Sequence, residues 1–272
     1  MKGPVTLGVL LLSVCFVSSC IKEHPNLTVG LVLNEYTTMF DSSQVYHHFY
    51  QRDSTGKVIA ERDSTKNTVL YMDVVYNNSG KATKASFRQD AGPVTFTYEF
   101  EYNAAGKISK RQRRSGSLQV DEDYNIYSYD ANGRLVADSQ YSIAHSSSYQ
   151  LAWVSKFSYV GNNVTSGENY QMVNGALVLY ARVKNEYDNK MNPFWSLENE
   201  YFYNEAGSAI YTITVKCLNN VVNQYAAKGT GDYQLQQTST YQYNSNGYVS
   251  KGRSVNVTQA HQNADMEYFY GF

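Results

Sequence analysis

The stretch YSYDANGRL, residues 127–135, decides the fold because its central phrase recurs along the chain in altered spellings. Most copies place a tyrosine four positions before a turn residue and an aromatic or apolar residue six positions before it; the first copy has Arg52 in the tyrosine position. Positions two apart on a strand lie on the same face. The turn residues of the copies are Gly56, Gly80, Gly106, Gly133, Asn163, Gly207 and Gly247.

The turn in this phrase has a physical mechanism. Asn and Asp side chains bond to their own backbone, and glycine adopts positive φ without a steric cost, so Asn/Asp-x-x-Gly between apolar runs predicts a hairpin connection. An apolar or small side chain returns two residues after the glycine, as at Ile108 and Leu135. Each copy therefore predicts a strand, a tight turn and a second strand.

Repetition of this unit predicts an all-β protein, a long antiparallel meander of hairpins. The 26 tyrosines agree, because tyrosine favours strands. A meander of about sixteen to eighteen strands accumulates too much twist to stay flat, so we expect a curled sheet, a trough or a partly closed barrel. Its terminal strands, near 27–36 and 266–272, should meet each other or be covered, since exposed edges invite aggregation.

The N-terminus predicts export and a lipid anchor. An apolar run at 5–17 follows Lys2, and it is typical of a secretory signal peptide because it is too short to span a bilayer. Small residues then precede Cys20, as in the lipobox of bacterial lipoproteins. We expect a cleaved signal at 1–19, a lipidated Cys20 with a tether over 20–26, and one β-repeat domain over 27–272. The alternative is an ordinary signal peptide that happens to end at a cysteine.

Composition and motifs predict neither a cofactor nor a metal, and no nucleic-acid partner. The net charge of -1 provides no basic face for nucleic acid. After processing only Cys217 remains, and a single thiol forms neither a bridge nor a metal site, so we expect a small core residue. No histidine stands at a recognised ligand spacing, and adjacent His47 and His48 should point to opposite faces. The full set is His24, His47, His48, His145 and His261.

The charged residues of the predicted strands raise two further functional hypotheses, an anionic-ligand patch and a carboxylate hydrolase. The stretch KISKRQRR at 107–114 could be an anionic-ligand patch, but we expect ion pairs with the next strand, Arg111 opposite Asp121 and Lys110 opposite Glu122. Because both faces of this stretch are charged, a transmembrane barrel is disfavoured. A hydrolase could use paired carboxylates, although alternating acidic and aromatic residues produce such pairs by chance. The candidates are Glu99, Glu101, Glu198 and Glu200.

The phrase YDANGRL at 129–135 resembles the core of YD repeats, the units of RHS-type β-shell proteins. YDNKMNPF at 187–194 resembles a phrase of uncharacterised YD-repeat-like lipoproteins of Bacteroidetes-type bacteria. The resemblance spans roughly residues 45–272 and implies a β fold without implying an activity. The chain is too short to enclose a toxin as the large RHS proteins do.

These observations predict a non-enzymatic, lipid-anchored cell-envelope protein, placed at the outer membrane through Cys20, that binds a protein, a glycan or a small aromatic ligand. The alternatives are a structural or assembly role without a ligand and the carboxylate hydrolase. Because the repeated phrase is architectural, function should lie where the copies differ. The irregular turns and the loop at 188–194 are the best places to look.

Overall fold

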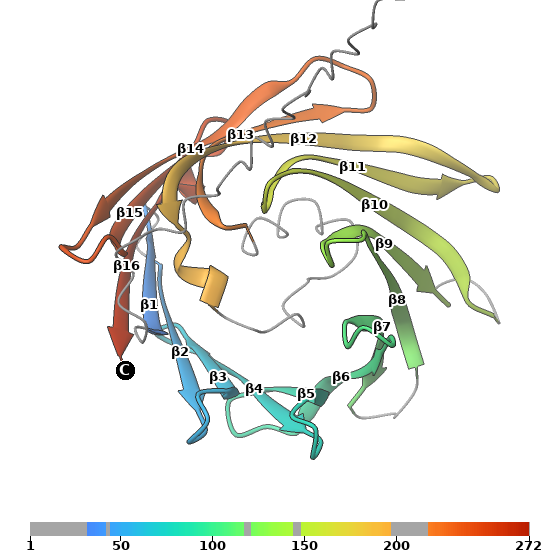
Figure 1. Cartoon of the computed structure of the whole chain (residues 1–272), viewed down its shortest axis with the longest axis horizontal. Coiled ribbons are helices and arrows are strands. Elements are labelled where there is room, and N and C mark those ends of the chain that lie inside the picture. The colour runs from blue at the N-terminus through green and yellow to red at the C-terminus, as the bar shows by residue number, and fades with distance from the viewer. Residues whose placement is uncertain (1–31, 42–43, 117–120, 144–147, 197–216, 272) are drawn as a thin grey trace, which may run out of the picture.

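The computed structural model describes residues 32–41, 44–116, 121–143, 148–196 and 217–271, and its strands form one closed antiparallel barrel (Figure 1). Each strand pairs with its neighbours in sequence. The strands are β1 Val32–Phe40, β2 Val45–Arg52, β3 Val58–Ser64, β4 Val69–Tyr76, β5 Ala82–Gln89, β6 Val94–Tyr102, β7 Ile108–Ser115, β8 Asp121–Tyr129, β9 Leu135–Ser142, β10 Gln150–Val160, β11 Asn163–Val173, β12 Ala176–Met191, β13 Asn219–Lys228, β14 Gln234–Tyr243, β15 Val249–Asn256 and β16 Ala264–Gly271.

Pairing of β1 with β16 closes the barrel, with Tyr36 opposite Tyr268. The prediction that the terminal strands meet is confirmed. From the sequence we expect a curled sheet, a trough or a partly closed barrel. The sheet instead closes completely, and complete closure leaves no unpaired strand edge. Among the described residues, two short 3-10 helices accompany the strands, η1 at Pro193–Ser196 and η4 at Ala260–Gln262. In the described part of the chain, no helix has the length and apolar character needed to cross a membrane.

The repeated turns have the geometry that their residues predict. Asp130 Oδ1 accepts hydrogen bonds from the backbone nitrogens of Asn132 and Arg134, both at 2.9 Å. Gly133 adopts a φ of 75°, in the left-handed region that favours glycine. These bonds also lower the pKa of Asp130, chiefly through the backbone and side chain of Arg134. The copies at Gly56, Gly80, Gly106 and Gly247 also have positive φ, whereas the copy ending at Gly207 lies outside the described residues.

The tyrosine of most described phrases ties its hairpin to the preceding one, whereas Tyr243 of the last phrase donates to Asp188. The Tyr129 hydroxyl donates to the Ile108 carbonyl at 2.8 Å, and the Tyr102 hydroxyl donates to the Ala82 carbonyl at 2.7 Å. Arg52, which replaces this tyrosine in the first copy, donates to the Leu33 carbonyl at 3.1 Å. The same bond recurs from Tyr76 and Tyr159 of two further phrases. Three tyrosines at other positions also donate to a backbone carbonyl of a neighbouring strand, namely Tyr187, Tyr241 and Tyr270. The repeated tyrosine therefore links hairpins around the barrel wall.

The helix η1 identifies the inner face of the barrel, because it lies inside the ring of strands (Figure 1). Its Phe194 contacts Tyr36 and Tyr268 edge-on, at ring distances of 5.1 and 6.0 Å. Side chains that share a face with these two tyrosines therefore point inward. The inward aromatic and aliphatic side chains pack into two buried clusters, which include Tyr98, Phe100, Ile108, Tyr127 and Val183 in one and Leu33, Tyr50, Val58, Val249 and Tyr268 in the other.

The outer face carries cross-strand ion pairs. Lys251 lies 2.6 Å from Glu267, and Lys110 lies 3.1 Å from Glu101. Glu101 follows the inward Phe100 and Glu267 precedes the inward Tyr268, so alternation directs both carboxylates outward. Further pairs on this face are Arg253 with Asp265, Arg114 with Glu99 and Arg88 with Asp73.

The expected register of β7 on β8 is wrong. Arg111 pairs with Asn125 and Lys110 with Ile126, while Arg114 lies opposite Asp121. The connection is longer than a three-residue loop, and each added residue shifts the pairing toward the C-terminal end of the partner strand. Ion pairing with the next strand nevertheless occurs, because Arg113 lies 3.0 Å from Glu122 of β8. Lys110 and Arg114 pair instead with the acidic residues of β6.

Candidate functional site

A cavity of about 640 Å³ lies against the inner wall formed by β13 to β16, β1 and β2, beside η1. None of the described residues that line it is charged. The lining consists mainly of amide and aromatic side chains, with two serines. The amides are Gln44, Asn192, Asn220, Gln237, Asn256 and Gln262, and the aromatic residues are Phe40, Tyr46, Phe194, Tyr241 and Tyr268.

Asn192 positions the helix η1 at this cavity. Its side-chain oxygen accepts a hydrogen bond from the Phe194 nitrogen at 3.0 Å, and its carbonyl accepts one from Trp195 at 3.0 Å. Its own nitrogen donates to the Leu218 carbonyl at 2.9 Å, which ties the turn to the start of β13. The sequence Asn-Pro therefore ends β12 and places Phe194 on the inner wall. This segment overlaps the 188–194 loop that the sequence marks as a place to look.

A carboxylate outside the lining fixes one of the lining amides, Asn220. Asp188 Oδ2 accepts a hydrogen bond from Asn220 Nδ2 at 3.0 Å and another from the Tyr243 hydroxyl. Burial, followed by the bond to Asp188, raises the pKa of Tyr243. Burial likewise raises the pKa of Tyr241 to about 12, and its hydroxyl donates to the Val221 carbonyl at 2.9 Å. These phenols are neutral near pH 7, so the cavity wall stays uncharged.

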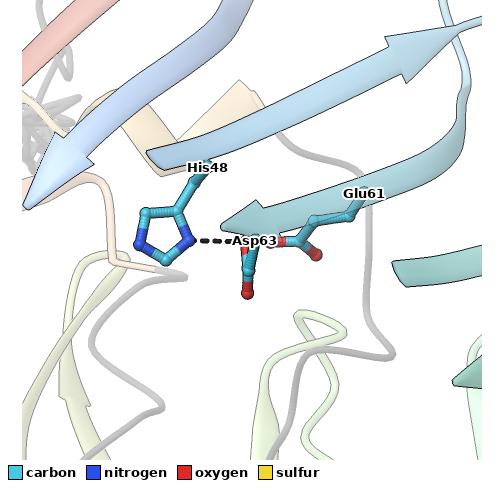
Figure 2. A group of neighbouring side chains, drawn as sticks. All are labelled: His48, Glu61 and Asp63. Atoms are coloured by element: carbon cyan, nitrogen blue, oxygen red, sulfur yellow. Dashed lines mark hydrogen bonds and ion pairs between the residues drawn. The ribbon is translucent and has the colours of Figure 1, made fainter. Parts of the chain in front are cut away.

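A second inward group lies on β2 and β3, next to the cavity wall (Figure 2). His48 Nδ1 lies 2.6 Å from Asp63 Oδ1, and the ligating atoms of His48, Glu61 and Asp63 all lie within 4.8 Å of one another. The Tyr36 ring stacks on His48 at 4.0 Å with an interplanar angle of 6°. Burial, and secondarily the charge of Asp63, raises the pKa of Glu61 well above its usual value.

A polar belt follows the inner wall on the opposite strands. Arg111 donates to Asn125 Oδ1 at 2.9 Å, and Asn125 donates to Asp138 Oδ1 at 2.7 Å. Ser155 then donates to Asn169 Oδ1 at 3.2 Å. Burial raises the pKa of Asp138 to about 6, although the Asn125 bond and the Arg111 charge oppose the rise. Most buried polar groups of the wall are thus satisfied by neighbouring strands.

The sequence-predicted candidates are dispersed. Cys217 is fully buried, and its sulfur accepts a hydrogen bond from the Val164 nitrogen at 3.3 Å, which confirms the core interpretation. Burial raises the pKa of its thiol, as expected of an unreactive cysteine. Glu99 and Glu101 point outward and pair with basic residues. Cys20, His24, His145, Glu198, Glu200 and Tyr203 lie outside the described residues, as does the signal segment.

The two histidines of β2 do point to opposite faces. His47 pairs with Thr37 on the outer face, and His48 pairs with Tyr36 on the inner face. Sequence reasoning missed the grouping of His48 with Glu61 and Asp63, because the three residues come from two strands and form no local ligand motif. The available signal was weak: Glu61 and Asp63 are two residues apart and therefore share a face.

Two solved structures share this architecture. A porin-like protein from Bacteroides uniformis superposes with a TM-score of 0.58 at 12% identity, covering 87% of this chain and 96% of that protein. A porin-like protein from Bacteroides vulgatus gives a TM-score of 0.54 at 10% identity, covering 89% and 99%. The chain shares its fold with these porin-like proteins. No protein-family model and no curated protein sequence matches it.

Proposed function

We propose that this chain is a lipid-anchored binding protein of the cell envelope, with a barrel that stands in water and holds an uncharged saccharide in the cavity beside η1. The observation that carries the proposal is the lining of that cavity, which combines amide and aromatic side chains with no charged group among the described residues. The role is one of binding rather than catalysis.

The lining matches the chemistry of a neutral sugar. Amide side chains offer both donors and acceptors, so Gln237 and Asn256 suit hydroxyl groups that also donate and accept. Aromatic rings such as Phe194 and Tyr268 provide flat apolar surfaces for the C–H faces of a sugar ring. A charged ligand would enter the cavity without a counter-charge, and a ligand bearing few polar groups would leave the amides unpaired.

The outer face supports a barrel that stands in water. Lys251 with Glu267 and Lys110 with Glu101 place ionised groups on the surface that a membrane barrel turns to lipid. A basic residue at the bilayer midplane costs about 2 to 4 kcal/mol. Attachment to the membrane is therefore assigned to lipid on Cys20, and the YD-repeat-like hairpins are assigned a scaffold role.

A glycan array tests the proposal, using the chain from residue 21 onward, which contains the whole described barrel. We expect binding to uncharged oligosaccharides, and calorimetry on the hits measures the affinity. The Gln237→Ala variant should lose binding by about 5- to 150-fold, because removal of one buried polar partner costs about 1 to 3 kcal/mol.

The matched control is Gln242→Ala, which removes the same side chain from the opposite face of the same strand. Gln242 precedes the inward Tyr243 on β14, is exposed, and lies outside the cavity lining. It should leave the affinity unchanged. An array without any uncharged hit, or equal losses in the two variants, would contradict the proposal and favour a structural role without a ligand.

A further inference from the structure

We propose that His48, Glu61 and Asp63 form a binding site for a divalent transition-metal ion such as Zn²⁺ on the inner wall of the barrel. The site is independent of the saccharide cavity, since none of its three residues lines that cavity. It rests on the pairing of two strands, on the chemistry of the three side chains and on the distribution of charge over the wall.

Strand pairing brings the three side chains together. His48 lies directly opposite Asp63 in the β2–β3 register, and Tyr50 lies opposite Glu61. Glu61 and Asp63 are two residues apart on β3 and therefore share the inner face. Figure 2 shows the imidazole and the two carboxylates converging from the two neighbouring strands.

The separations suit a small ion. Zn²⁺ binds imidazole nitrogen and carboxylate oxygen at about 2.0 to 2.2 Å, so its ligand atoms lie roughly 3 to 4 Å apart. The ligating atoms of this group lie within 4.8 Å of one another, and His48 Nδ1 is already 2.6 Å from Asp63. His48 Nδ1 and Asp63 Oδ1 are closer than two ligands of one ion, and rotation about their side-chain bonds would separate them to admit it. An imidazole ligand favours zinc and its neighbours over Ca²⁺ and Mg²⁺, which prefer oxygen.

The charge around the group is the independent observation. Buried charges in proteins are paired or bind metal ions. On the outer wall Glu101 and Glu267 each have a lysine partner. Asp63 lies 2.6 Å from His48, and among the described residues no lysine or arginine forms an ion pair with Glu61 or Asp63. A divalent cation would supply the positive charge that this part of the wall lacks.

The aromatic surroundings orient the ligands. Tyr36 stacks on the His48 ring and holds its plane, and the same tyrosine contacts Phe194 and Tyr268. Residues behind the ligands commonly fix the orientation of metal-binding imidazoles. Three protein ligands leave a coordination position for water. Phe194 and Tyr268, which contact Tyr36, also line the cavity. The metal site would therefore lie beside the saccharide site without sharing a ligand with it.

Calorimetric titration of Zn²⁺ into the metal-stripped chain from residue 21 onward tests the site. We expect one ion per chain for the wild type, and a loss of affinity of tenfold or more in both His48→Ala and Asp63→Asn. His47→Ala is the matched control, because it removes the adjacent, outward histidine. It should bind as the wild type does. Circular dichroism of each variant reports its fold, and either folded ligand variant suffices for the comparison.

A second measurement identifies the ligand atoms. The visible absorption of bound Co²⁺ should lack the thiolate charge-transfer band that Cys217 would add, and it should vanish in His48→Ala. Absence of stoichiometric binding by the wild type, or an equal loss in His47→Ala, would overturn the proposal. Gln237→Ala should retain Zn²⁺ binding, so failure of the saccharide proposal is distinguishable from failure of this one.

Discussion

Replacement of Asp138 by asparagine should remove a specific pH dependence from the stability of the barrel. Burial raises the pKa of this carboxyl from 3.8 to about 6 in the folded protein. The folded state therefore holds the proton more tightly than the unfolded chain does. The resulting stabilisation is fully present below about pH 4 and is lost as the pH rises through about 6.

The size of the effect follows from the same values. A rise of about 2 pH units in the pKa corresponds to roughly 3 kcal/mol in the free energy of unfolding. Asp138 is 4% exposed, so solvent screening does not reduce this figure much. An amide at this position can still accept the bond from Asn125, which lies 2.7 Å away in the wild type. The substitution therefore removes the titration while leaving that hydrogen bond possible.

Urea unfolding at several values between about pH 4 and pH 7 measures the effect as a difference between two proteins. The free energy of unfolding of the wild type minus that of Asp138→Asn should fall by roughly 2 to 3 kcal/mol over this range. Asp130→Asn is the control, because hydrogen bonds lower the pKa of Asp130, so this carboxyl titrates mainly below about pH 4 and its difference should stay nearly constant over this range. A wild-type minus Asp138→Asn difference that is constant or rises with pH would refute the reasoning.

Two further substitutions test the wall and the anchor. Tyr129→Phe removes the hydroxyl that donates to the Ile108 carbonyl, so the free energy of unfolding should fall by about 0.5 to 1.5 kcal/mol in chemical denaturation. Tyr141→Phe, on the outer face, is its control, and an equal loss there would count against a special role for the repeated tyrosine. Cys20→Ala should abolish incorporation of labelled fatty acid by expressing cells; continued labelling would defeat the lipoprotein assignment.

The repeated phrase made the fold predictable from the sequence because its residues act locally. Asp130 and Gly133 form the turn through their own backbone bonds, so a window of a few residues contains the necessary information. Closure was less predictable, since it depends on β1 reaching β16 across the whole chain. The β7–β8 register was mispredicted because loop length, which sets the pairing, has no sharp signal between Ser115 and Asp121.

The candidate site was only partly predictable. The segment at 188–194 stood out because it breaks the rhythm of the repeat, and Phe194 does lie at the cavity. The prediction of a loop over this whole segment is wrong, because residues 188–191 continue the strand β12. The amides that complete the lining, such as Gln237 and Asn256, come from separate strands and look like ordinary polar strand residues in the sequence. Their convergence follows from the curvature of the closed wall, which no local pattern encodes.

Fluorescence of Trp195 tests the central claim most directly, because this residue lies on η1 next to Phe194. Trp153→Phe leaves Trp195 as the only tryptophan of the chain. Titration of that variant with an uncharged oligosaccharide from the array should change the emission saturably, with the affinity measured by calorimetry, and Gln237→Ala should abolish the change. Calorimetric binding that leaves Trp195 emission unaltered, or a change that survives Gln237→Ala, would contradict a saccharide site in the cavity.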